Sequence, residues 1–186
     1  LLGTWQGDTA AGHYGAAYKL AEAAGMLPAS LLDAVFPEMA LLAARREGAA
    51  RLGQLARRFG PLLFVGGLAL AAVGTGLAAP LVRLVYGFAE ARSVTVTALQ
   101  IQLWTVPPMF LYLLSGHILY ALGRQRRVTL VMAVVAGINA TLDLFVIPRW
   151  GVIGVSGVSV LSAVLLWILL SHQARRALHR EREDTR

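Results

Sequence analysis

The chain has 186 residues, of which 57% are hydrophobic and 15% are charged, whereas a typical soluble domain carries about 25% charged and 45–50% apolar residues. The charges gather in short clusters between long uncharged segments, which excludes a soluble enzyme, a disordered chain and a small disulfide-bonded secreted domain. Cysteine is absent, and the net charge of +7 comes from arginines beside apolar segments. We therefore expect no thiol chemistry, no cofactor and no nucleic-acid partner. The composition predicts an all-α membrane protein.

The first predicted span covers residues 14–44 and carries charged residues along its length. The chain starts at Leu1 without a basic segment or a signal cleavage site, so we expect it to be part of a longer protein. Because residues 14–44 contain acidic and basic side chains, an amphipathic helix at the membrane surface or in solution is an alternative interpretation. A membrane span with a polar face is favoured, because every neighbouring segment is a membrane span.

Four further segments are long and apolar enough to cross a hydrocarbon core of about 30 Å, which takes about 20 helical residues. They are predicted at residues 59–82, 93–123, 128–148 and 150–171. The second of the four measures about 46 Å as a straight helix, so we expect a kink at Pro107-Pro108 in its centre. The connection between the last two is too short for anything but an antiparallel hairpin.

The basic residues alternate between the two sides of the predicted bundle. Thirteen of the 17 Lys and Arg residues follow the first, third and fifth spans, three lie in the other connections, and Lys19 lies within a span. The positive-inside rule then predicts a polytopic bundle of about five transmembrane helices with its N-terminus outside the cell. Residues 1–13 are expected to form an extracytoplasmic loop and residues 172–186 a basic cytoplasmic tail.

Polar side chains within the predicted spans are candidates for a substrate or ion pathway. At 100° per residue, Lys19, Glu22 and Asp33 fall within about 60° of one another on the first span. Charges at membrane depth are costly unless they line a cavity or are paired, so this stripe predicts a pathway. The alternative is a Lys19–Glu22 pair that satisfies itself. Asn139 and Asp143 lie four residues apart on one face of the fourth span.

Two histidines in the apolar part of the chain have no second ligand at a metal-binding spacing. We therefore interpret His13 and His117 as structural and predict no metal site. No nucleophile–base constellation, P-loop or zinc-protease motif is present, so we expect no enzymatic activity.

Several motifs resemble those of polysaccharide-export flippases in the multidrug/oligosaccharidyl-lipid/polysaccharide exporter superfamily. The main one is the hairpin NATLDLFVIPRWGVIG at residues 139–154, similar to the family pattern of Asn, an apolar run, Ile-Pro, an aromatic residue and two glycines. Three more agree in order: GHYGAAYKL at residues 12–20, followed by VFP at 35–37; LVYGF at 84–88; and LYALGR at 119–124. The resemblance covers residues 12–171.

The resemblance implies a flippase that moves a lipid-linked sugar across the inner (cytoplasmic) membrane, with the bilayer and a missing N-terminal helix bundle as partners. In that family two six-helix bundles face a central cavity, and this chain is similar to the last five helices of the second bundle. Lys19 would then contact the lipid diphosphate or an acidic sugar, and Glu22, Asp33 and Asp143 would take part in ion coupling. A cation-coupled multidrug exporter of the same superfamily is the alternative, and a membrane-embedded glycosyltransferase or ligase is a third hypothesis.

Overall fold

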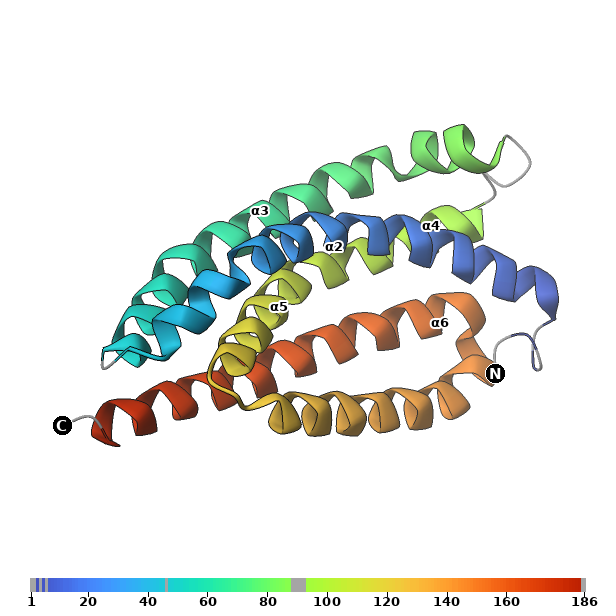
Figure 1. The fold of residues 1–186 in the computed structure, drawn as a ribbon. Helices are drawn as coiled ribbons and strands as arrows, with labels where there is room; N and C mark the ends of the chain where they lie inside the picture. Colours follow the sequence, from blue (N-terminus) through green and yellow to red (C-terminus); the bar gives the residue numbers. More distant parts are fainter. Residues whose placement is uncertain (1–2, 4, 6, 46, 88–92, 185–186) are drawn as a thin grey trace.

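The computed structural model describes residues 3, 5, 7–45, 47–87 and 93–184, and within them the secondary structure is helical (Figure 1). In chain order the elements are α2 (Asp8–Ala43), α3 (Gly48–Tyr86), α4 (Ser93–Gln102), the 3-10 helix η2 (Leu103–Thr105), α5 (Val106–Ala121) and α6 (Gln125–Asp184). The all-α prediction is therefore confirmed.

The helices extend beyond the predicted spans. α2 starts at Asp8, six residues before the predicted start of the first span at residue 14. α3 includes Arg51, Arg57 and Arg58, which the hydropathy pattern left outside the span at 59–82. Hydropathy marks the part of a helix that suits the hydrocarbon core, and a helix can continue into water with exposed arginines, which are good helix formers.

The third predicted span is bent close to the expected place. α4 gives way to η2 at Leu103, and α5 then starts with Pro107 and Pro108 in its first turn. A proline has no backbone N–H and is tolerated in the first turn of a helix, where that N–H has no intrahelical partner. The kink is confirmed, and the irregular backbone lies a few residues before the prolines.

α6 consists of two helical arms, residues 125–150 and 152–184, which are joined at Gly151. Gly151 has φ 50° and ψ −134°, a conformation that side-chain-bearing residues rarely adopt. Figure 1 shows the second arm running back along the first, and a hydrogen bond of 2.9 Å from Asn139 Nδ2 to Ser162 Oγ links the arms. The predicted hairpin is present, and the basic tail continues the second arm as a helix.

The helices pack through two clusters of buried apolar residues. One cluster joins α2, α3, α5 and α6 around Met39, Leu52 and Leu119. The other joins α2, α3, α4, η2 and the start of the second arm of α6 around small residues such as Ala17 and Ala78. Small side chains let membrane helices approach closely, which suits a bundle that gains little from apolar burial within lipid.

Many large apolar side chains lie on the outer surface of the bundle, including Leu27 and Leu41, both 70% exposed. Four of the described helices, α2, α3, the helix through α4 and α5, and α6, are long and apolar enough to cross a membrane. That number counts α6 once, although it has two arms. The molecule is a multi-pass membrane helix bundle. The α2–α3 turn, the α5–α6 turn and the C-terminal end of α6 lie together at one end of it (Figure 1).

Candidate functional site

The polar stripe of α2 lies on the more exposed side of the helix. α2 packs through Ala17, Leu32 and Met39, which are buried, whereas Lys19, Glu22 and Asp33 are all exposed. At 100° per residue the stripe lies about 130° around the helix from the packed face. The three predicted residues therefore lie on one exposed side of α2.

Lys19 lines a cavity of about 580 Å³ between α2 and α3, together with His13, Gly15 and Tyr86 among others. In the described part of the chain no ion pair joins Lys19 to Glu22, since the ion pairs found there involve other residues. The self-satisfied pair considered from the sequence is therefore not formed in this structure. Lys19 is thus an exposed cation at the edge of this cavity.

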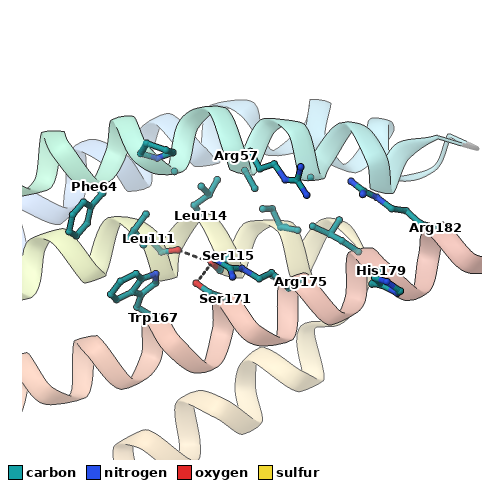
Figure 2. Close-up of a pocket in the computed structure, with 17 residues that line it drawn as sticks. Arg57, Phe64, Leu111, Leu114, Ser115, Trp167, Ser171, Arg175, His179 and Arg182 are labelled. Carbon is teal, nitrogen blue, oxygen red and sulfur yellow. Dashed lines mark hydrogen bonds between the residues drawn. The ribbon is translucent and has the colours of Figure 1, made fainter.

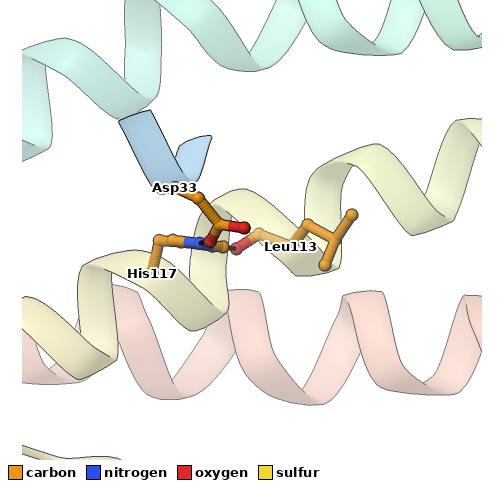
Figure 3. A network of polar contacts seen from close by, with 3 residues as sticks. All are labelled: Asp33, Leu113 and His117. Carbon is orange, nitrogen blue, oxygen red and sulfur yellow. Dashed lines mark hydrogen bonds and ion pairs between the residues drawn. The ribbon is translucent and has the colours of Figure 1, made fainter. Parts of the chain in front are cut away.

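Asp33 is brought into contact with His117 of α5, as Figure 3 shows. The distance from His117 Nε2 to Asp33 Oδ1 is 2.9 Å, and His117 Nδ1 lies 2.8 Å from the carbonyl oxygen of Leu113. The His117 side chain is 11% exposed, whereas that of Asp33 is 73% exposed. The rings of Phe36 and Tyr120 make T-shaped contacts with the imidazole, at centroid distances of 6.0 and 6.2 Å.

The two contacts of His117 restrict where protons can sit. A backbone carbonyl only accepts hydrogen bonds, so Nδ1 must carry a proton and donate it to Leu113. The hydrogen bond between Nε2 and Asp33 Oδ1 then contains one further proton, which belongs either to an imidazolium or to a carboxylic acid. The pair thus joins α2 to α5 through one hydrogen bond, and its carboxyl side is the exposed one.

Asn139 and Asp143 lie in the first arm of the α6 hairpin. Asn139 is hydrogen-bonded to Ser162 of the second arm, and Asp143 Oδ1 is buried without a hydrogen-bond partner. The hydroxyl of Tyr14 reaches the same arm of α6 from α2 and lies 3.0 Å from Ser159 Oγ. This polar cluster is separate from the Asp33–His117 pair. Across the described residues no three His, Cys, Asp or Glu side chains come together as metal ligands.

His117 is the residue of this site that sequence reasoning missed, because a lone histidine in an apolar segment has no local partner. Its partner is 84 positions away in the chain. One signal was available: both Asp33 and His117 precede basic connections, Arg45 and Arg124, and so lie toward the same end of the bundle. Depth narrows the choice of partners, but only packing determines which helices touch.

A multi-pass bundle that carries uncovered intramembrane charges on one helix has the architecture of a membrane transport protein. A family model described as "Lipid II flippase MurJ" matches residues 9–184. The chain belongs to this family of lipid II flippases. The comparisons with curated proteins and with solved structures gave no match.

The family match refines the resemblance drawn from the motifs. The lipid II flippases are part of the exporter superfamily that the motifs indicated, so a flippase family for lipid-linked precursors is confirmed. The match does not extend to the polysaccharide-export branch, which the hairpin motif had suggested. A flippase is a transporter and not an enzyme, as the sequence predicted, and the match favours it over the multidrug exporter.

Proposed function

We propose that this chain is the C-terminal part of a flippase that moves a lipid-linked sugar from the inner to the outer leaflet of the cytoplasmic membrane. The observation that carries the proposal is the exposed polar stripe of α2 in a chain of the lipid II flippase family. Flipping needs no bond to be made or broken. It needs a polar path for the headgroup while the lipid chain stays in the bilayer.

The arrangement of the helices supports five crossings, with the N-terminus outside and the C-terminus in the cytoplasm. Counting the two arms of α6 separately turns four long helices into five antiparallel elements. The three arginine-rich clusters lie at the same end of the bundle (Figure 1), which is the end that the positive-inside rule assigns to the cytoplasm. The uncovered stripe of α2 then faces a first helix bundle of the same protein, across a central cavity.

The residues of the pathway have distinct roles in this proposal. Lys19 is the cation that meets the diphosphate of the lipid-linked substrate, because an ammonium group forms charge-assisted hydrogen bonds with phosphate oxygens. Glu22 lies about one turn further along the same stripe, and the Asp33–His117 pair holds an exchangeable proton. Asn139 and Asp143 provide oxygen ligands in a second polar cluster. The acidic residues Glu22, Asp33 and Asp143 are the candidates for binding the coupling ion.

The substrate that we propose is lipid II, a sugar–peptide on an undecaprenyl diphosphate, because the family match names it. The hairpin motif at residues 139–154 favours a second candidate, the lipid-linked repeat unit of a surface polysaccharide. Depletion of the full-length protein from its host tests the two. Accumulation of lipid II in the inner leaflet with arrest of wall synthesis is the expected result, whereas loss of a surface polysaccharide with normal wall synthesis identifies the second substrate. Unchanged levels of both precursors, together with new sensitivity to cationic dyes, would overturn the proposal.

A further inference from the structure

A groove with a volume of about 720 Å³ lies between α3, α5 and α6 near the arginine-rich end of the bundle (Figure 2). It lies apart from the polar stripe of α2, and the residues that line it come from the other three helices. α5 contributes an apolar floor that includes Leu111 and Leu114, and α6 contributes one face that extends from Trp167 to Arg182. Fifteen residues of helix give this face a length of about 22 Å.

The groove exists because the facing side of α3 carries small residues. Gly53, Ala56 and Gly60 follow one another on the side that lines the groove. A Cβ atom at Gly60 would meet no atom within 4 Å, so the space there is unfilled. At Gly53 the opposite holds, because Arg182 from α6 crosses closely over it and donates a hydrogen bond of 3.3 Å to Ala50 O. The groove is thus bridged by Arg182 at its arginine end and unfilled at Gly60.

The polarity of the groove changes from one end to the other. Arg57, Arg175 and Arg182 line the end that is nearest to the basic connections. At the other end Phe64 and Trp167 stack across the groove with a centroid distance of 6.2 Å. The hydroxyls between these ends are satisfied: Ser115 Oγ lies 3.1 Å from Ser171 Oγ and also donates to Leu111 O at 2.9 Å (Figure 2).

Two arginines at this end, Arg57 and Arg175, stand outside the ion pairs of the described acidic residues nearby. Those ion pairs are Glu181 with Arg124 at 2.7 Å, Glu47 with Arg51 at 3.8 Å, and Glu183 at 3.4 Å with His179, which itself lines the groove. Within the described residues, neither Arg57 nor Arg175 takes part in an ion pair. The groove therefore has a net positive end that continues into an apolar wall.

We infer that this groove binds an anionic phospholipid of the bilayer, with its phosphate between Arg57 and Arg175 and an acyl chain along Leu111, Phe64 and Trp167. Basic pockets between membrane helices are suited to anionic headgroups. The apolar wall favours a lipid over a free anion, because free phosphate would leave the apolar lining of the groove, including Leu111 and Leu114, uncovered. The inference does not rest on the proposed transport function, since lipid occupancy is measured without flipping.

The test uses p-benzoylphenylalanine in place of Gly60, in the full-length protein reconstituted in vesicles of equal phosphatidylglycerol and phosphatidylcholine. Gly66 is the matched control position, since it lies on α3, has equally open space at its Cβ and does not line the groove. After illumination, the crosslinked lipid is identified by mass spectrometry. The expected result is an enrichment of phosphatidylglycerol of about fivefold or more at position 60 and the bulk ratio at position 66. The bulk ratio at both positions overturns the inference.

Substitutions of the arginines then identify the headgroup contacts. Arg57→Ala and Arg175→Ala should each reduce the enrichment about fivefold, because each arginine contributes about 1 kcal/mol to anionic-lipid binding. Arg58→Ala and Arg176→Ala are the controls, since these exposed neighbours do not line the groove, and they should leave the enrichment unchanged. Equal reductions in the groove variants and in the control variants would show that the enrichment depends only on surface charge. The groove would then not be the lipid-binding site.

A second variant keeps the arginines and fills the groove. Gly60→Leu should leave the size-exclusion profile unchanged and should reduce the phosphatidylglycerol that remains bound through purification by about fivefold or more. Retention at the wild-type level would contradict the inference even if an arginine variant failed to fold. Displacement of phosphatidylglycerol from position 60 by an equimolar lipid-linked diphosphate would assign the groove to the transported substrate instead, and would overturn the choice of occupant.

Discussion

The contact between Asp33 and His117 predicts a measurable coupling between α2 and α5. A hydrogen bond between membrane helices contributes about 0.6 kcal/mol on average and at most about 1.7 kcal/mol, and a charge-assisted bond is about twice as strong as a neutral one. The bond length of 2.9 Å is favourable, but the 73% exposure of the Asp33 side chain allows solvent to screen the charge. We therefore expect a coupling free energy of about 1 kcal/mol.

A double-mutant cycle isolates this coupling from the other contacts of both residues. The variants Asp33→Leu, His117→Leu and the double variant are unfolded reversibly in bicelles, and the free energy of unfolding is compared among them. The loss of the imidazole contacts with Phe36 and Tyr120 is common to both arms of the cycle and cancels. Glu38→Leu replaces Asp33→Leu in the control cycle, since Glu38 is an exposed acidic residue of α2, and its coupling to His117 should be near zero.

Asp33→Asn separates the hydrogen bond from the proton. The amide can still donate to Nε2 of a neutral imidazole, so this variant should retain about half of the coupling. It cannot exchange the proton, so transport should fall if the pair carries the coupling ion. A coupling free energy below about 0.3 kcal/mol in the Asp33→Leu cycle, the level at which independent sites add, would refute the reasoning from geometry.

Three further predictions concern the stripe, the topology and the hairpin. Lys19→Leu should insert normally and impair flipping, whereas Lys19→Arg should retain activity; normal flipping in the Leu variant, measured in proteoliposomes, would remove the role in anion binding. A cysteine at Leu84 should react with an impermeant thiol reagent in intact cells and one at Ala50 should not, and the reverse pattern would invert the topology. Gly151→Ala should lower the free energy of unfolding by about 1–3 kcal/mol, because Gly151 has a positive φ. Gly157→Ala is the control, since Gly157 is helical and has open space at its Cβ, and it should not lower the free energy of unfolding. Equal stabilities of the two variants would show that the Gly151 backbone tolerates a side chain.

The hydropathy of the chain determines much of the fold. Uncharged segments of about 20 residues or more become helices, since backbone groups within lipid must be bonded internally. The short connection at residues 148–151 forces the hairpin of α6, and Gly151 provides the reversal. The polar stripe of α2 was likewise predictable, because Lys19, Glu22 and Asp33 share one arc and that arc follows from the period of the helix.

The tertiary structure alone decided which of these faces meet. His117 is a lone histidine in the sequence and comes into contact with Asp33 only because α5 packs beside α2. Phe64 and Trp167 are far apart in the chain and come together only across the groove between α3 and α6. Hydropathy and helical period act along one segment at a time, whereas the choice of neighbouring helices depends on the fit of small and large side chains between segments that are distant in the chain.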